Sequence, residues 1–172
     1  MVVYPAACAA AGNVKYQTVF DVVTEKKVNQ IIRSEVIPLT GKKHGEIISR
    51  VSSEFLDTLY LADTLIGGPG VSEALVANFN AVDCYTLVDY VEALARIRDQ
   101  NSFKNTLARI RYTGVNVYYF IRRHFFSIWF AKSPYNARDI TPIIIPDYKV
   151  SEKKLNRKSD GIEYIPGLVF YT

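Results

Sequence analysis

The segment that begins at Asp83 constrains the fold most, because it joins a helix start to a continuous apolar face. Apolar residues recur there at three- and four-residue intervals, which places them on one side of a helix. They are Leu87, Val88, Val91, Leu94 and Ala95. Asp83 stands directly before this pattern, where an N-cap residue is expected. Such a helix must be buried against other elements, so the sequence predicts a packed core with Cys84 in the first turn of that helix.

The same periodicity predicts three more helices. They cover residues 26–36, which Pro38 would end, residues 46–59, and a segment that Ser102 would cap and that would break near Gly114.

Other stretches indicate loops, a strand and an undecided region. Residues 64–70 are too rich in Gly and Pro to continue a helix and predict a loop. Residues 115–130 are dense in aromatic side chains and are compatible with a strand followed by a helix. The β-branched run 140–145 is typical of a strand, and Pro142 favours an edge position or a bulge.

Length and composition are those of one ordinary globular domain, which we place at residues 16–172. The chain has 172 residues, of which 49% are hydrophobic and 22% charged, and its 13% aromatic content argues against a disordered chain. Residues 1–15 are Ala-rich and are either a signal-peptide remnant or a flexible terminus. No run of 18 apolar residues occurs, so no transmembrane helix is predicted.

The charge pattern favours solvated surface over a nucleic-acid site. The net charge is +4, and the basic residues stand in short groups rather than in one stripe. A weaker alternative is a nucleic-acid binder that uses the basic groups near the aromatic residues: Arg122, Arg123, Lys153, Lys154, Arg157 and Lys158. No metal-ligand spacing and no phosphate-binding loop occur in the sequence, so no metal and no cofactor are expected.

Cys84 is the candidate nucleophile. A thiol reacts as the thiolate, and a helix N-terminus stabilises that anion through free backbone N–H groups and the helix dipole. The alternative is a small buried cysteine with no chemical role. A nucleophilic thiol also needs a base. The sequence contains two histidines, of which His44 is interpreted as solvated surface and His124 as either a packed residue or the base.

Several ordered sequence blocks resemble the N-acetylmuramoyl-L-alanine amidase-like family, which belongs to the NlpC-type papain-like cysteine hydrolases. The similarity extends from about Phe55 to Pro166. The blocks are Leu61–Gly67, Glu73–Phe79, Val82–Leu94, Ile110–Tyr112 with Gly114, and Arg123–Trp129.

The resemblance implies an α+β papain-like fold, in which the cysteine opens a helix packed on an antiparallel sheet. It implies a hydrolase that cleaves amide bonds in peptidoglycan stem peptides or muropeptides, in the periplasm or cell envelope. Cys84 would be the nucleophile and His124 the base available in this chain. Tyr85, Thr86 and Trp129 are the candidate substrate-binding residues. We expect a monomer.

The sequence departs from the family pattern at three places. Leu87 replaces the usual aromatic residue, and Ile128 stands where the family tends to have an acidic one. The family's histidine is expected further downstream in a Gly-Asp…His-Val-Gly context, and nothing after Pro166 matches it. We therefore expect a C-terminally truncated domain with an incomplete sheet. The alternative function is a non-catalytic remnant or binding module without the catalytic histidine.

Overall fold

The computed structural model describes residues 16–99, 101–114, 116–131, 136–149, 152–153, 160, 162–163 and 170–171. The Ala-rich segment 1–15, interpreted above as a signal-peptide remnant, lies outside these residues. The described part combines helices with short strands, which confirms an α+β class. None of the helices in these ranges has the length and hydropathy that a membrane span requires.

The chain enters the fold through strand β1 (Gln17–Phe20) and helix α1 (Val22–Ile31). The predicted helix 26–36 exists, but it starts earlier because the Asp21 carboxylate accepts a hydrogen bond from the Thr24 amide at 2.6 Å. It continues through a π-helical turn, η1 (Ile32–Val36), and a 3₁₀ turn, η2 (Ile37–Leu39).

Helix α2 (His44–Ser53) is shorter than the predicted range 46–59. The hydroxyls of Ser52 and Ser53 donate to backbone carbonyls three residues earlier, and such bonds compete with the helical pattern. Asp57 then adopts a left-handed conformation with φ of +62°. The last apolar residue of the pattern therefore leaves the helix and starts strand β2 (Leu59–Tyr60).

The expectation of one antiparallel sheet is wrong for the two strand pairs of the N-terminal half. Strand β1 pairs in parallel with β3 (Ala74–Ala77), and β2 pairs in parallel with β4 (Ala81–Val82). Helices α1 and α2 lie between β1 and β3 in the chain, and they supply the long crossover that parallel pairing requires. The C-terminal strands β5 (Glu152–Lys153) and β6 (Phe170–Tyr171) are antiparallel.

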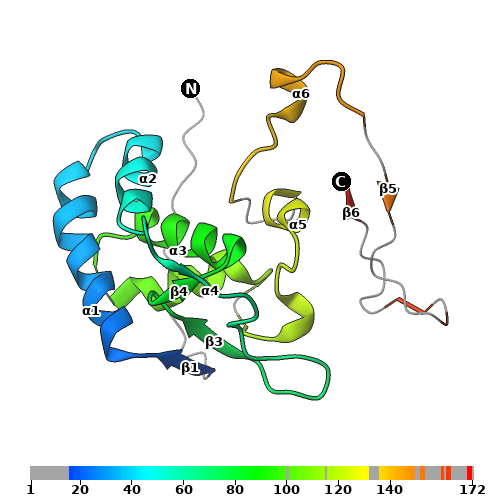
Figure 1. Cartoon of the computed structure of the whole chain (residues 1–172), viewed down its shortest axis with the longest axis horizontal. Coiled ribbons are helices and arrows are strands. Elements are labelled where there is room, and N and C mark those ends of the chain that lie inside the picture. The colour runs from blue at the N-terminus through cyan, green and yellow to red at the C-terminus, as the bar shows by residue number, and fades with distance from the viewer. Residues whose placement is uncertain are drawn as a thin grey trace.

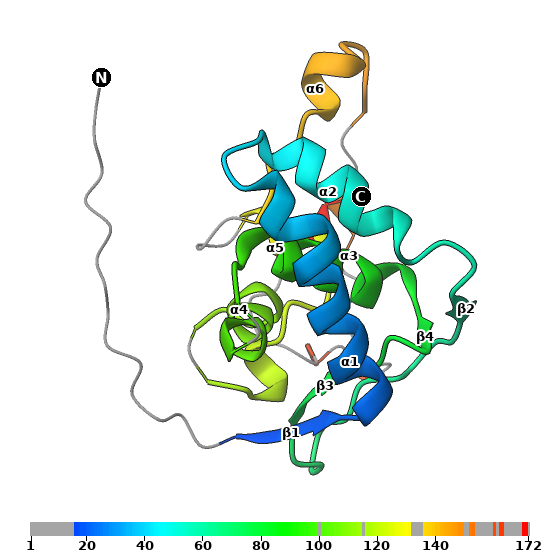
Figure 2. The same cartoon turned by 90° about the vertical axis from the view of Figure 1, so that its left-hand side faces the viewer.

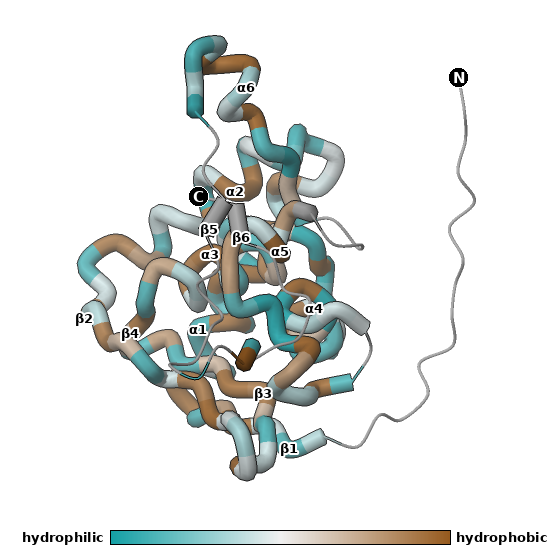
Figure 3. The backbone as a smooth tube through the Cα atoms, turned by 90° about the vertical axis from the view of Figure 1, so that its right-hand side faces the viewer, coloured by the Kyte–Doolittle hydropathy of each residue, from teal (hydrophilic) through white to brown (hydrophobic). Residues whose placement is uncertain are grey.

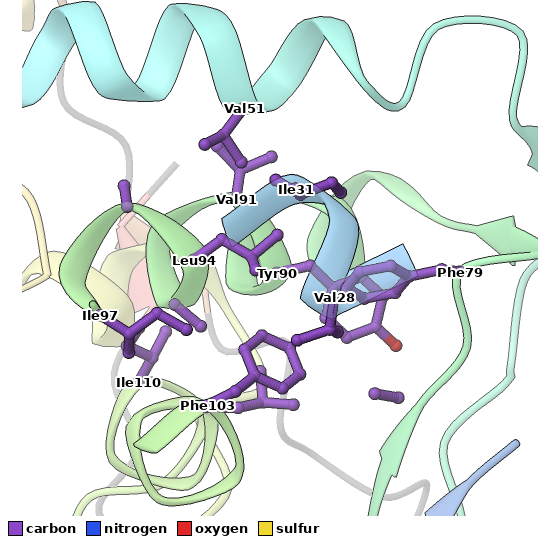
Figure 4. Close-up of a cluster of buried hydrophobic side chains, with 14 of the residues drawn as sticks. Val28, Ile31, Val51, Phe79, Tyr90, Val91, Leu94, Ile97, Phe103 and Ile110 are labelled. Atoms are coloured by element: carbon purple, nitrogen blue, oxygen red, sulfur yellow. The ribbon is translucent and has the colours of Figure 1, made fainter. Parts of the chain in front are cut away.

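Helices α3 (Cys84–Arg96) and α4 (Asn101–Arg111) form the centre of the domain. Helix α3 packs against both α2 and α4, as Figures 1 and 2 show. Figure 4 shows the core at this junction, where side chains of α1, α2, α3 and α4 meet around Tyr90 and Phe79. The buried α3 predicted from sequence is confirmed, including its first residue.

The start of α4 differs from the prediction in detail. Ser102 lies within its first turn, and its amide donates to the carboxylate of Asp99 at 3.1 Å. Asp99 therefore supplies the capping acceptor that the sequence analysis assigned to Ser102.

The segment after α4 contains helical turns where a strand was considered. The aromatic stretch forms a 3₁₀ turn, η3 (Tyr119–Ile121), and helix α5 (Phe126–Ala131). The predicted strand 140–145 is wrong, because Thr141–Ile144 forms the short helix α6. Pro142 suits this first turn, where its missing N–H has no helical partner. Figures 2 and 3 show α6 projecting from the body with hydrophobic residues on it.

Candidate functional site

The N-terminus of α3 is built by a capping box that fixes Cys84 at the surface. The Asp83 carboxylate accepts a hydrogen bond from the Thr86 amide at 2.7 Å, and the Thr86 hydroxyl accepts one from the Asp83 amide at 3.0 Å. Cys84 is the first residue of the helix, and its thiol is exposed and forms no disulfide. The alternative of a small buried cysteine is therefore wrong for this side chain, because its thiol is exposed.

Two backbone N–H groups beside this thiol are free to bind a ligand. The amides of Thr86 and Leu87 are used in the cap, the second through the Asp83 carbonyl at 3.0 Å. Within the described part of the chain, the amides of Cys84 and Tyr85 have no acceptor. The helix start thus presents two aligned donors, as helix N-termini that bind anions do.

A cavity of about 190 Å³ lies next to this helix start. Cys84 is not part of its wall, although both chain neighbours of Cys84 are. The lining residues are Leu65, Asp83, Tyr85, Thr86, Arg111, Arg122, Arg123 and His124. The fold therefore brings together three of the predicted site residues, Tyr85, Thr86 and His124, with three arginines that sequence reasoning did not assign to the site.

Tyr85 is fixed at the edge of this cavity by contacts with α5. Its hydroxyl donates to the Phe125 carbonyl at 3.3 Å, and its ring stacks on Phe126 with centroids 4.7 Å apart. Burial raises the pKa of Tyr85, and the nearby Asp89 carboxylate adds to this, so the phenol stays protonated.

His124 lies in the cavity wall but does not contact the thiol. Its Nε2 lies 2.8 Å from the Tyr119 carbonyl, which can only accept, so Nε2 carries the proton. Burial lowers the pKa of His124, the bond to Tyr119 opposes this, and Arg122 lowers it further. The ring is therefore neutral at pH 7, with a lone pair on Nδ1. No hydrogen bond joins Cys84 to either histidine in this structure.

His44 is engaged elsewhere, at the start of α2. Its Nε2 lies 3.1 Å from a carboxylate oxygen of the buried Glu92, and 51% of its side chain is exposed. The interpretation of His44 as solvated surface agrees with this exposure, and the sequence did not predict the contact with Glu92.

Thr86 and Trp129 have structural contacts that already account for their polar groups. Thr86 is fully buried in the cap, and the Trp129 indole is buried and donates to Asp89 at 2.9 Å. Trp129 lines a separate apolar groove with Leu87 and Val88 rather than the arginine cavity. The substrate-binding role of Tyr85, Thr86 and Trp129 stays a prediction.

A buried ion pair lies directly behind the cavity. Asp89 and Arg111 are both fully buried, and the Arg111 Nε donates to the Asp89 carboxylate at 2.8 Å. Arg111 Nη1 also donates to the Val76 carbonyl at 2.6 Å. Burial lowers the pKa of Arg111, but Asp89 outweighs this effect and the net direction is upward. Burial raises the pKa of Asp89 against the pull of Arg111. The Asp89–Arg111 pair is ionised, because both oxygens of the carboxylate accept N–H hydrogen bonds, one from Arg111 and one from Trp129.

A second ion pair closes the other side of the cavity. Glu73 accepts from Arg122 at 3.0 Å and from the Tyr112 hydroxyl at 2.7 Å. Arg122 also lies over the Tyr119 ring at 4.9 Å. Arg123 donates to the carbonyl of Trp129 at 3.0 Å, which fixes α5 against this wall.

The sequence carries no direct signal for this network. Asp89 and Arg111 lie on the most buried faces of α3 and α4, beside Tyr90 and Leu107. A charged residue on a buried face needs a charged partner, but the apolar repeat from Leu87 to Ala95 does not indicate that Asp89 is buried. Among the described residues, no cluster of His, Cys, Asp or Glu could hold a metal ion.

Comparisons with known proteins give one family and three similar solved structures, two of which have a TM-score above 0.5. Residues 50–172 match the model of a family described as N-acetylmuramoyl-L-alanine amidase-like. The chain is 30% identical to an N-acetylmuramoyl-L-alanine amidase from Bacteroides uniformis, with a TM-score of 0.51 over 67% of this chain and 48% of that one. It is 25% identical to a Legionella pneumophila protein of family DUF1460, with a TM-score of 0.58 over 81% of this chain and 52% of that one. The chain thus spans about half the length of both proteins. Comparison with curated protein sequences gave no match.

Proposed function

Because this chain belongs to the N-acetylmuramoyl-L-alanine amidase-like family, we propose that it is the nucleophile-bearing part of a peptidoglycan amide hydrolase. It acts as an amidase or peptidase on stem peptides, and Cys84 is its nucleophile. The observation that carries this proposal is the exposed, unpaired Cys84 thiol at the first residue of α3, beside an arginine-lined cavity. A thiol in this position can reach a carbonyl carbon that approaches from solvent.

The reaction uses the groups at the helix start in order. The Cys84 thiolate attacks the amide carbonyl, and the resulting oxyanion is held by the free amides of Cys84 and Tyr85. The carbon–nitrogen bond then breaks, and the leaving amine departs with a proton. Water hydrolyses the thioester and returns the thiol, so each turnover consumes one water and yields one acid and one amine.

Proton transfer in this chain is assigned to His124. Its Nε2–H is fixed by Tyr119, so the lone pair on Nδ1 is available to accept the thiol proton and to return it to the amine. Since no hydrogen bond joins Cys84 to His124 here, the imidazole must approach the sulfur in the substrate complex. Catalytic hydrogen bonds are often long before substrate binds.

We propose a papain-like hydrolase of the NlpC type. The supporting observation is that a cysteine opens a buried helix in an α+β domain. We also propose the periplasm or cell envelope as its compartment, because the substrate of an N-acetylmuramoyl-L-alanine amidase lies there. Fractionation of the native cells, followed by immunoblotting, tests this compartment, and a wholly cytoplasmic signal would contradict it.

The direct test is cleavage of N-acetylmuramoyl-L-alanyl peptides, followed by mass spectrometry of the released peptide. Cys84→Ala should abolish release, and Cys8→Ala, which removes the other cysteine of the sequence, should leave it unchanged. Equal release by the wild-type and Cys84→Ala chains would exclude Cys84 as the nucleophile.

One observation favours a second candidate, a binding module without turnover. In the described part of the chain, Cys84 has no imidazole within hydrogen-bond distance. The two candidates differ in thiol reactivity, measured with iodoacetamide in a Cys8→Ala background. If the chain is a hydrolase, iodoacetamide should alkylate the Cys84 thiol much faster than it alkylates the thiol of glutathione at the same pH. A rate equal to that of glutathione, together with muropeptide binding and no cleavage, would establish the binding module instead.

A further inference from the structure

The cavity beside α3 is lined by arginines, two of which are held by carboxylates behind the wall: Arg111 by Asp89 and Arg122 by Glu73. Three of its lining side chains are arginines, and one, Asp83, is acidic. The Asp83 carboxylate is turned into the helix cap, where it accepts hydrogen bonds from the amide and the hydroxyl of Thr86. Burial keeps His124, also in the wall, in its neutral form.

Arg111 has an unused donor in this wall. Its Nε is bound to Asp89 and its Nη1 to the Val76 carbonyl. Its Nη2 is buried, and no residue in the described ranges accepts a hydrogen bond from it. Buried guanidinium nitrogens without an acceptor are rare, because burial removes the water that would otherwise bind them. An acceptor that comes with a ligand would complete the arrangement.

Arg122 lines the same cavity. Its Nη1 holds Glu73, and its side chain is 12% exposed, so the guanidinium is fixed but still reachable. Arg122 and Arg111 come from different segments and border one cavity, so a planar anion between them could accept from both. Guanidinium groups favour carboxylates for this reason, since their N–H donors match the two oxygens.

We propose that this cavity is the subsite for a carboxylate of the substrate, bound by Arg111 Nη2 and Arg122. The inference rests on the proposed function, because it takes Cys84 as the residue that attacks the scissile amide. Tyr85 follows Cys84 directly and lines the cavity. The carboxylate therefore belongs to a residue adjoining the cleaved bond. The substrate class is an acylated peptide with a free carboxylate close to the alanyl amide.

The test compares two probes that differ in one charge. N-acetylmuramoyl-L-alanyl-D-glutamate carries a free α-carboxylate on the residue after alanine, and N-acetylmuramoyl-L-alanyl-D-isoglutamine carries a carboxamide there. Binding is measured by calorimetry on the full chain with Cys84→Ala, which prevents turnover. The carboxylate probe should bind at least about tenfold more tightly than the carboxamide probe, as expected for a charge-assisted hydrogen bond.

Variants show whether the cavity causes this preference. Arg122→Gln should bring the ratio of the two dissociation constants close to one. Arg109→Gln removes the same charge from an exposed position of α4 and should leave the ratio unchanged. Arg111→Lys tests the buried donor, and its circular dichroism spectrum reports whether the chain still folds; if it does not, the Arg122→Gln result decides.

Three outcomes would overturn the inference: equal affinities for the two probes in the parent chain, no binding of either, or an equal loss of preference in Arg109→Gln. Inorganic phosphate that displaced the carboxylate probe at equal concentration would also overturn it, since the cavity would then be a general anion site. Calorimetric binding does not need the thiol. If the chain prefers the carboxylate probe but the wild-type chain does not cleave, the subsite is supported and the hydrolase is refuted. If the wild-type chain cleaves but shows no preference, the hydrolase is supported and the subsite is refuted.

Discussion

Replacing Asp89 by asparagine should destabilise the domain strongly, because it removes one charge from a fully buried ion pair. Asparagine has the size of aspartate and can still accept from the Trp129 indole. The Arg111 guanidinium would keep its charge, since arginine is not deprotonated in proteins. Its remaining contacts would be the Val76 carbonyl and the Tyr90 ring, whose centroid lies 5.6 Å from the guanidinium carbon, and neither carries a compensating charge.

The expected size follows from the burial of both partners. Neither the Asp89 nor the Arg111 side chain is exposed, so solvent cannot screen the uncompensated charge. Removing one partner of such a pair costs about 3–5 kcal/mol. For a chain of this length that corresponds to a fall in melting temperature of roughly 6–20 °C. By comparison, Glu25→Gln breaks the half-exposed pair with Lys104 and should cost no more than about 1 kcal/mol.

Urea unfolding gives the free energies, followed by far-UV circular dichroism and by the fluorescence of Trp129, the only tryptophan in the chain. The wild-type chain, the single variants Asp89→Asn and Arg111→Met, and the double variant form a double-mutant cycle, which measures the interaction free energy of the pair. The double variant should recover most of the loss, because no charge then remains buried. A loss below about 1 kcal/mol for Asp89→Asn, equal to that of Glu25→Gln, would refute the buried ion pair.

Three further predictions concern residues around the same site. Gly67→Ala should cost at least about 1 kcal/mol more in urea unfolding than Gly70→Ala. Both glycines have positive φ, but a Cβ at Gly67 would lie 1.8 Å from a Glu73 carboxylate oxygen and one at Gly70 would meet nothing; equal losses would contradict this contact. Asp83→Ala should lower the free energy of unfolding by about 1 kcal/mol and Asp83→Asn by much less, and no difference between them would refute the cap. Burial lowers the pKa of His124, so the unfolded chain binds more protons and stability should fall as pH drops through the usual value of 6.5. His124→Gln should reduce that fall between about pH 7.5 and about pH 5, and an unchanged pH dependence would exclude His124 as its source.

The helix that carries the site could be predicted because its information is local. Asp83, the apolar repeat and the position of Cys84 lie within one short segment, and capping and periodicity both act over a few residues. The prediction was less accurate about the faces of this helix. Leu87 and Val88 are only partly buried, whereas the most buried face includes Thr86 and Asp89.

The cavity could not be predicted in the same way, because its parts are distant in sequence. Asp89 and Arg111 are 22 residues apart, and Glu73 and Arg122 are 49 residues apart. A buried charge looks unfavourable until its partner is known, and periodicity contains no information about partners. The same limitation applies to α6, whose β-branched residues favoured a strand, although in the described part of the chain no strand pairs with this segment.

The loop at 64–70 shows how a segment interpreted as a simple connection contributes to the site. Gly67 has φ of +135° and leaves the space that the Glu73 carboxylate occupies. That carboxylate holds Arg122 and the Tyr112 hydroxyl, and Leu65 of the same loop lines the cavity. A side chain at position 67 would therefore displace Glu73 and release Arg122 from its place in the cavity wall. The glycine is required for the position of an arginine 55 residues later, which links the backbone geometry of a loop to the charge that a substrate carboxylate would meet.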